Sequence, residues 1–456
     1  MAGQNIEAAK LRASPRHASA MTIPGSFSVS PELDGVLLDL DNTLCPTDHL
    51  RWIRSKGDRV QLAPHLPGLC AYRGMEEALA ELARVVPLGI VSRTHRWYVE
   101  DVLTHLFPHV RWRAVVSYDD VPRQKPYPDG LQLAAQRMGL SVPSRIAYLG
   151  DSKSDIEAAY HAGMRPVLCT WEPSSAAIAS AQQIIPDAVL AQPAEILSYA
   201  SDPGTYLPYL ESLLRGKTAP TGTRRSVSLG TFDPFRIDVL GRYFADAGST
   251  LHLHQAHPLS KWIERKDEPG QFEQPRLVEA MRAAVVALVQ EYGLDTVTVI
   301  PGKPGGTPRM ERLFSLVGDQ LRGVLPVSFE LGMLAFSEDA QRIKYFSQSK
   351  RREEIERSLR LVGSSAGKRV MVVDDVLTSG GTMLTARQLL LGGGATYVAG
   401  LAMAKTISGY SFDADPTYRE CPRCGRRVTL IRRKDGGRFW GCEGFRIDGC
   451  KYTTDA

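Results

Sequence analysis

The 456-residue chain lacks long apolar runs. None approaches the roughly 20 residues that a membrane-spanning helix needs, and the first 30 residues lack the apolar centre of a secretory signal. We therefore expect a cytoplasmic protein without membrane association, with a flexible polar tail over residues 1–30. A hydrophobic content of 43% and a charged content of 23% are typical of folded globular domains, and the length predicts two or three of them.

Cysteine is scarce until the end of the chain, where four of the seven cysteines fall in the last 36 residues: Cys421, Cys424, Cys442 and Cys450. A disulfide-linked secreted scaffold would not distribute them in this way, whereas a reduced protein with one metal site would. A Cys-x-x-Cys pair followed by a second pair predicts a tetrahedral Zn²⁺ site. Because four thiolates leave no open position, we expect this zinc to be structural.

A large charge excess is also absent, because the formal net charge is only +5. The last 36 residues hold nine basic and four acidic residues, a difference of five, and therefore carry the whole excess. Basic residues beside Phe439 and Trp440 suit single-stranded nucleic acid, in which bases stack and phosphates meet arginine. DNA or RNA is thus a candidate partner of the tail; the alternative is a module that only docks or stabilises.

Short apolar runs alternate with helical patterns twice along the chain. This alternation predicts α/β architecture with two doubly wound, parallel-sheet domains, each with both sheet faces covered. We expect the first domain over residues 31–200 and the second over 226–412. A polar stretch rich in proline, glycine and threonine predicts a linker over 201–225, and the zinc ribbon occupies 413–456.

Two acids directly follow the first apolar run, in the order Asp39-Leu40-Asp41-Asn42-Thr43. This position is the carboxyl edge of a parallel sheet, where ligands bind in open α/β folds. One carboxylate can attack a phosphorus atom while the other protonates the departing oxygen. Alone, the motif is only suggestive, since an acidic strand end followed by a turn has the same sequence.

Three later loops supply what such a reaction needs. Ser92 ends another apolar run and offers a hydroxyl for a phosphoryl oxygen, and Lys125 offers a cation for a charge-rich transition state. Asp151 and Asp155 follow a further strand, and their oxygens suit Mg²⁺. The four loops meet at one sheet edge, which predicts a single site.

With these four motifs, residues 35–200 resemble the haloacid dehalogenase superfamily. The resemblance implies that Asp39 is a nucleophile that forms an aspartyl-phosphate and that Asp41 is the general acid and base. It also implies that Ser92 and Lys125 hold the phosphoryl group. Magnesium would be held by Asp39, Asp151 and Asp155, with the backbone carbonyl of Asp41. The segment between Leu44 and Met75 is too short for a large cap. In this superfamily a minimal cap implies bulky substrates or a lid borrowed from a neighbouring domain.

A second motif joins a buried strand to an acid pair and a phosphate-type loop, Asp374-Asp375-Val376-Leu377-Thr378-Ser379-Gly380-Gly381-Thr382. Backbone N–H groups and hydroxyls of such a loop can face a phosphate at a helix start, and the acids suit ribose hydroxyls. The loop lacks the Gly-Lys-Ser/Thr of a nucleoside-triphosphatase and the Gly-x-Gly-x-x-Gly of a dinucleotide site. A phosphorelay receiver is a weaker alternative, because no glycine-rich loop follows the acid pair there.

This run resembles the phosphoribosyl-pyrophosphate signature of type I phosphoribosyltransferases, in the competence-protein-F-like branch. The resemblance implies that Asp374 and Asp375 hold the ribose and that residues Thr378, Ser379, Gly380, Gly381 and Thr382 wrap its 5′-phosphate. Lys303, in a loop that follows an earlier strand, would face the pyrophosphate, with Mg²⁺ as cofactor. The tail around Trp440 resembles the C-terminal zinc ribbons of type IA topoisomerases. By contrast, His252, His254 and His257 alternate with leucines, which predicts a strand with exposed imidazoles rather than a metal cluster.

These motifs favour a bifunctional enzyme of the bacterial type that acts on nucleotides or nucleoside-like metabolites. The second domain would transfer ribose 5-phosphate to or from a base, and the first would remove the 5′-phosphate. The alternative is a phosphatase that trims nucleic-acid ends, recruited by the ribbon, with a nucleotide-sensing second domain. A regulator that binds ligands without turnover is disfavoured by the intact acid pairs. The acceptor base, the phosphorylated substrate and any self-association are left open.

Overall fold

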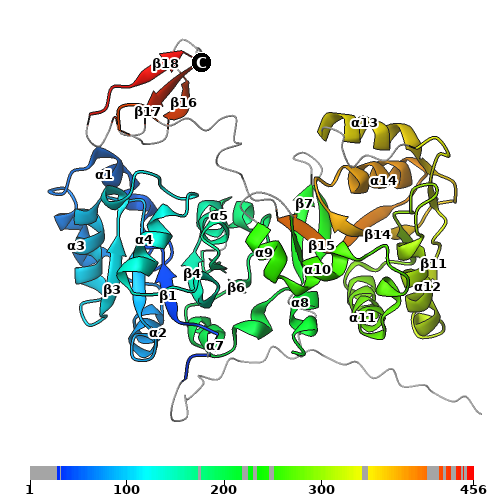
Figure 1. The fold of residues 1–456 in the computed structure, drawn as a ribbon, viewed down its shortest axis with the longest axis horizontal. Helices are drawn as coiled ribbons and strands as arrows, with labels where there is room; N and C mark the ends of the chain where they lie inside the picture. Colours follow the sequence, from blue (N-terminus) through cyan, green and yellow to red (C-terminus); the bar gives the residue numbers. More distant parts are fainter. Residues whose placement is uncertain are drawn as a thin grey trace, which may run out of the picture.

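The computed structural model describes residues 28–30, 32–172, 176–217, 224–229, 234–245, 251–340, 348–407, 421–424, 428–432, 438–442, 445 and 449–455. Most of the predicted polar tail, residues 1–27, lies outside them. Within the described residues, no helix combines the length and the hydropathy needed to cross a bilayer. The chain forms two α/β domains that lie side by side and a small C-terminal sheet (Figure 1).

The first domain is built on a six-stranded sheet in the order β3-β2-β1-β4-β5-β6, with every neighbouring pair parallel. Its strands are β1 Gly35–Leu38, β2 Leu88–Val91, β3 Trp112–Val116, β4 Ile146–Gly150, β5 Arg165–Cys169 and β6 Ala188–Leu190. The strand order reverses next to β1, since β2 lies on one side of it and β4 on the other. The loops after these strands therefore part and leave a crevice at the carboxyl edge.

Helices cover both faces of this sheet, as the buried, aliphatic strands require. They are α1 Arg51–Lys56, α2 Met75–Leu82, α3 Arg96–Leu106, α4 Asp129–Arg137, α5 Lys153–His161, α6 Ala176–Gln182 and α7 Glu195–Ser201. Only the short helix η1 (Asp48–Leu50), α1 and the short helix η2 (Ala63–Gly68) lie between β1 and α2. The cap segment is therefore small.

The second domain has a sheet in the order β11-β10-β14-β15-β8-β7, with β9 also paired to β15. Its strands are β7 Arg225–Leu229, β8 Phe235–Val239, β9 Arg242–Phe244, β10 Thr296–Val299, β11 Ser328–Phe329, β14 Arg369–Leu377 and β15 Tyr397–Ile407. The expectation of a purely parallel sheet fails at one edge, where β7 and β8 are antiparallel. The connection between them is too short for a crossover, so only antiparallel pairing is possible.

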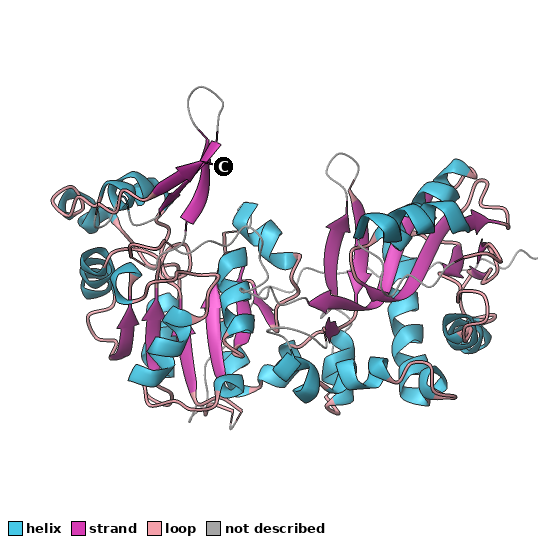
Figure 2. Cartoon of the chain, turned by 45° about the horizontal axis from the view of Figure 1, so that its top comes forward, coloured by secondary structure: helices cyan, strands magenta, loops and turns pink. Residues whose placement is uncertain are grey.

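The remaining elements of this domain surround the sheet (Figure 2). They are α9 Leu251–Ala256, α10 Pro258–Glu264, α11 Pro275–Tyr292, α12 Arg309–Leu321, α13 Gln348–Ser358 and α14 Gly381–Gly392, with a separate two-stranded antiparallel sheet of β12 Leu334–Phe336 and β13 Leu359–Leu361. The tail forms a three-stranded antiparallel sheet of β16 Val428–Arg432, β17 Arg438–Cys442 and β18 Thr453–Asp455.

The stretch predicted to be a linker contains structure. Residues Pro203–Tyr206 form a short helix and Tyr209–Leu214 form α8, in which Tyr209 and Leu210 are buried in the core of the second domain. Apolar residues of α5 and α6, including Ile156 and Ile178, belong to the same core cluster as Val227 and Phe235 of the second domain. The two domains therefore share a packed boundary rather than a free tether.

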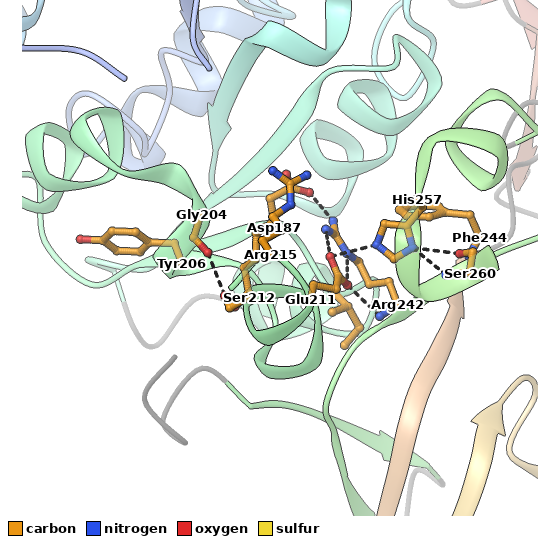
Figure 3. Close-up of polar contacts among 12 residues, drawn as sticks. Asp187, Gly204, Tyr206, Glu211, Ser212, Arg215, Arg242, Phe244, His257 and Ser260 are labelled. Carbon is orange, nitrogen blue, oxygen red and sulfur yellow. Dashed lines mark hydrogen bonds and ion pairs between the residues drawn. The ribbon is translucent and has the colours of Figure 1, made fainter. Parts of the chain in front are cut away.

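A buried polar network also ties the domains together (Figure 3). Arg242 of β9 forms ion pairs with Glu211 of α8 and with Asp187, which precedes β6 in the first domain. The same guanidinium donates to the Tyr160 hydroxyl of α5 at 2.9 Å. Burial raises the pKa of Glu211, but the charges of Arg242 and His257 outweigh it and hold that pKa well below its ordinary value.

The histidine prediction was wrong. Residues 251–256 form a helix rather than a strand, and the side chain of His254 is fully buried, with its Nδ1 2.7 Å from the carbonyl of Phe244. His257 accepts from the N–H of Ser260 at the start of α10 and lies 3.1 Å from Glu211. The side chain of His252 lies outside the described part of the chain. Alternation of leucine and histidine was misleading because packing against β9 stabilises the helix.

Candidate functional site

Asp39 leaves the end of β1 with its backbone N–H bonded to the carbonyl of Leu149 in β4, and its side chain is buried. Three residues later the chain turns through Asn42, which has a positive φ of 57°. Asparagine tolerates this left-handed conformation better than most side chains. The turn lets both Asp39 and Asp41 line the same cavity.

Asp39, Asp151 and Asp155 form a cluster at the carboxyl edge of β1 and β4. One oxygen from each carboxylate lies within 4.8 Å of the others. Asp155 is fixed by a capping box at the start of α5, in which its Oδ2 accepts from the N–H of Ser152 at 3.0 Å and from its hydroxyl at 2.5 Å. These are the three acids that the sequence predicted as side-chain ligands of Mg²⁺.

Lys125 reaches this cluster from the loop after β3. Its Nζ donates to Asp39 Oδ1 and to Asp155 Oδ1, each at 2.6 Å, and to the hydroxyl of Tyr148 at 2.7 Å. Tyr148, in the middle of β4, was missed by the sequence analysis. The only signal was a tyrosine inside an otherwise aliphatic buried strand, and nothing in the sequence shows which way its hydroxyl points.

The electrostatics of the cluster suit a bound cation. Burial raises the pKa of Asp39 to about 7 even though Lys125 opposes the shift, and burial with the charges of Asp155 and Asp39 raises the pKa of Asp151 to about 8. Asp155 has a lowered pKa, because its contact with Lys125 outweighs its burial. Three buried carboxylates thus share one ammonium group. Oxygen ligands with excess negative charge are what Mg²⁺ requires, so the residues fit this ion.

Asp41 lies apart from the metal-type cluster. Its Oδ1 is 2.5 Å from Arg54 of α1, and it accepts from the Thr47 hydroxyl at 2.7 Å and from the Tyr98 hydroxyl at 3.3 Å. The small cap therefore supplies a cation to the predicted general acid, a contact that the sequence did not reveal.

Ser92 lies at the end of β2 and is buried, and its Oγ is 2.7 Å from the Thr94 hydroxyl. Its neighbours Arg93 and Thr94 line the cavity above the acid cluster. That cavity has a volume of about 700 Å³ and is also lined by Arg51 and Arg54 of α1. Carboxylates of Asp39, Asp41, Asp48 and Asp151 line it as well, so the cavity holds charges of both signs.

In the second domain, Asp374 and Asp375 lie near the end of β14. Asp375 Oδ2 accepts from Arg309 of α12 at 2.5 Å and from Lys266 at 2.9 Å. These cations outweigh the effect of burial and hold the pKa of Asp375 well below its ordinary value. Asp374 has no such partner among the described residues; burial, and then the charge of Asp375, raise its pKa to about 8. The lysine partner was not found from the sequence.

The predicted phosphate loop joins β14 to α14. Gly380 has a φ of +80° and directly precedes the helix. A Cβ atom there would lie 2.2 Å from a methyl group of Leu229, so glycine is required by both conformation and space. Thr378, Ser379, Gly381 and Thr382 complete the turn at the helix start. Lys303 follows β10, and its Nζ lies 5.3 Å from the centre of the Phe336 ring.

The four C-terminal cysteines gather into one cluster with all sulfur atoms within 4.8 Å of one another. Two of the distances are 3.6 Å for Cys421–Cys450 and 3.4 Å for Cys424–Cys442. Four thiolates around Zn²⁺, with Zn–S bonds of about 2.3 Å, lie about 3.8 Å apart in an ideal tetrahedron. Burial opposes ionisation of Cys421, but the backbone N–H groups of Arg423 and Cys424 lower its pKa to about 7. The cluster fits the ion.

Comparison with known proteins agrees with both α/β domains. Residues 53–169 match the haloacid dehalogenase-like hydrolase family, and residues 270–419 match the phosphoribosyl transferase domain family. The first match begins after Asp39 and Asp41, so their assignment depends on the motif and on the geometry described above.

Phosphoglycolate phosphatase of Escherichia coli (strain K12) is 32% identical over 133 residues, which are 29% of this chain and 52% of that protein. The protein of the same name from Salmonella typhimurium is 29% identical over 133 residues, with the same coverage. The chain thus spans about half the length of the curated relatives that it matches.

Among solved structures, CbbY from Rhodobacter sphaeroides in complex with phosphate is 18% identical and covers 36% of this chain and 96% of its own, with a TM-score of 0.30. A hydrolase from Pseudomonas syringae is 17% identical with the same two coverages and a TM-score of 0.30. The chain carries a haloacid dehalogenase-like hydrolase domain and a phosphoribosyl transferase domain, followed by four cysteines gathered near its C-terminus.

Proposed function

We propose that the first domain hydrolyses phosphate monoesters of small metabolites and that the second uses phosphoribosyl pyrophosphate. The observation that carries the first half is the cluster of Asp39, Asp151 and Asp155 around Lys125. Both reactions would take place in the cytoplasm, where phosphorylated metabolites are present and thiols stay reduced.

In the proposed phosphatase reaction, an Asp39 oxygen attacks phosphorus while the bond from phosphorus to the ester oxygen breaks. Asp41 gives its proton to that leaving oxygen. Water then attacks the aspartyl-phosphate, Asp41 takes the proton back, and the bond between phosphorus and Asp39 breaks to release phosphate. Lys125 neutralises charge on the phosphoryl oxygens. Bound Mg²⁺, held by the three acids of the cluster, would supply further charge neutralisation.

The side chains that line the cavity narrow the proposed substrate class. Arg51, Arg54 and Lys125 line it paired with carboxylates of the same cavity, whereas Arg93 forms no ion pair within the described residues. Arg93 therefore favours a substrate with a second anionic group. The relatives named phosphoglycolate phosphatases fit this class, as do nucleotides. We therefore propose an anionic phosphate monoester, such as a nucleotide or a phosphorylated carboxylic acid, as the substrate.

The test is Mg²⁺-dependent phosphate release from nucleotides, ribose 5-phosphate, phosphoglycolate and phosphorylated oligonucleotides. Asp39→Asn should abolish release from every substrate, because the amide is a poor nucleophile. Asp48→Asn is the matched control, since Asp48 lines the same cavity but its side chain is 68% exposed and paired with Arg51. Activity that persists in Asp39→Asn would refute the mechanism.

For the second domain, the acid pair and the loop from Thr378 to Thr382 support use of phosphoribosyl pyrophosphate with Mg²⁺. We expect release of pyrophosphate when a suitable base is supplied, and loss of this release in Asp375→Asn. Asp267→Asn is the control, because Asp267 also contacts Arg309 but is 72% exposed. A panel of bases that never yields pyrophosphate would leave the transferase half without support.

A second candidate function has one specific observation in its favour. In both views the C-terminal sheet stands on the α1 side of the first domain (Figures 1 and 2), and α1 lines the phosphatase cavity. With Zn²⁺ in the four-cysteine site, the basic tail would bring DNA or RNA ends to that cavity. A preference for phosphorylated oligonucleotides that falls with salt and with removal of residues 413–456 would support this function; binding that ignores salt would exclude it.

A further inference from the structure

A second cavity lies between the two domains, away from the phosphatase cluster. It has a volume of about 470 Å³. The first domain contributes one face of α5 and the end of α6, and the second contributes β7, the end of β15, and Thr378 and Ser379 of the predicted phosphate loop. The predicted phosphate site of one domain thus opens toward a helix of the other.

The walls of this cavity are held in place from two sides. The apolar residues at its base, such as Ile184 and Leu229, belong to or pack on the core cluster that spans both domains. Nearby, the Arg242 network joins β9 to Glu211 and to Asp187 and Tyr160 of the first domain (Figure 3). Buried ion pairs with several hydrogen bonds tolerate little displacement. The cavity is therefore a built feature of the boundary.

The chemistry of the cavity favours an anion. Lys405, at the end of β15, donates to the carbonyls of Thr378 and Thr406, each at 3.0 Å, and it pairs with no carboxylate in the described part of the chain. The hydroxyl of Thr406 is buried, and the structure gives it no hydrogen-bond partner among the residues described. Buried polar atoms are normally satisfied. A half-buried ammonium and an unsatisfied hydroxyl beside a threonine-serine loop are what a phosphate would complete.

The first domain adds charge at the opposite wall. Lys153, the first residue of α5, lines the cavity with its side chain 46% exposed. The acidic group in this wall is Glu157, which lies 3.6 Å from Lys153 and forms an ion pair with it; burial raises the pKa of Glu157. The same helix carries Asp155 of the phosphatase cluster near its start, and Ser152, which directly precedes the helix, lines the phosphatase cavity.

We propose that the cavity between the domains binds the phosphate monoester of a small metabolite. The phosphate meets Thr378, Ser379 and Lys405, and the ligand reaches across to Lys153 of the first domain. The assignment rests on the proposed function in one respect, that the loop after β14 binds phosphate. It adds that the hydrolase domain forms part of that binding site, so the second domain alone has an incomplete one.

The test measures binding of ribose 5-phosphate to the full chain by calorimetry, in an Asp39→Asn background that prevents hydrolysis. Lys153→Ala should raise the Kd by about threefold, as expected for a partly exposed charge pair. Lys405→Met should raise it by about tenfold, because a charged hydrogen bond from a half-buried ammonium to the phosphate is lost. Lys261→Ala is the matched control, since Lys261 is 48% exposed and also pairs with a glutamate on its own helix; it should leave the Kd unchanged.

Hydrogen exchange then locates the ligand. Ribose 5-phosphate should slow exchange in residues 153–161 as well as in residues 376–384. The shared site would be overturned if Lys153→Ala and Lys261→Ala had the same Kd for ribose 5-phosphate and hydrogen exchange slowed only in the second domain. Pyrophosphate release by the wild type separates failure of the shared site from failure of the proposed transferase function. If the wild type releases pyrophosphate but Lys153→Ala binds ribose 5-phosphate as the control does, only the shared site is refuted.

Discussion

Replacing Arg242 by methionine should destabilise the boundary between the domains. Arg242 is 3% exposed and its ion-pair partner Glu211 is 5% exposed. The substitution leaves the buried carboxylate of Glu211 in contact with His257 and the backbone N–H of residue 242, and it also removes the ion pair of Asp187. Removing one partner of a buried ion pair costs about 3–5 kcal/mol. For the whole chain unfolding as one cooperative unit, the unfolding entropy is roughly 2 cal/mol/K per residue. This loss of unfolding free energy therefore lowers the Tm by about 3–5 °C.

A double substitution separates this charge effect from lost packing. Arg242→Met with Glu211→Leu removes the charges of this buried pair and keeps apolar volume, and replacement of a buried pair is often nearly neutral. Asp187, the other ion-pair partner of Arg242, keeps its charge, but its side chain is 14% exposed. We expect calorimetric unfolding of the double variant to regain more than half of the Tm lost by Arg242→Met. A single variant that unfolds within 1 °C of the wild type, or a double variant less stable than the single one, would refute the reasoning.

Three further outcomes are expected. Arg54→Ala should lower the kcat of phosphate release by about tenfold or more, because a charge-assisted contact with the general acid is lost. Arg51→Ala, on the same helix but with a side chain that is 76% exposed, should change the kcat far less. Equal effects of the two substitutions would contradict the role of Arg54. Cys424→Ser should release zinc to a chelating dye, whereas Cys70→Ser, at an exposed cysteine outside the cluster, should not; equal zinc content in both variants would remove the metal site. The folded protein holds the pKa of Glu211 below its unfolded value of about 4.3. The stabilising contribution of Glu211 is therefore present above that pH and is lost as the pH falls below it. The Tm measured at pH 3–6 should depend less on pH in Glu211→Gln, and an unchanged slope of Tm against pH would count against this shift.

Local motifs predicted much of the candidate site. A strand followed by acids was recognisable at Asp39 and Asp151, because parallel strands that follow one another along the chain end at the same sheet edge. The structure places their carboxylates within 4.8 Å of one another, together with Asp155. The four cysteines were predictable for a similar reason, since their spacing brings two pairs of thiolates together across a short hairpin.

Contacts that depend on the packing of distant elements were not predictable. Arg54 pairs with Asp41 only because the small cap folds back over β1, and Lys266 meets Asp375 across 109 positions of sequence. At the histidines near residue 254 the local pattern instead predicted the wrong element. Alternation with leucine is typical of a strand, but tertiary packing stabilises a helix there.

By itself, the sequence indicated which residues are candidates for the chemistry and in what order the strands and loops present them, because those features depend on neighbours along the chain. Only the tertiary structure decided how the domains meet. The ion pairs of Arg242 and the cavity beside Thr378 join segments far apart in the sequence. Such contacts depend on shape and charge complementarity between folded surfaces, and no local pattern records them.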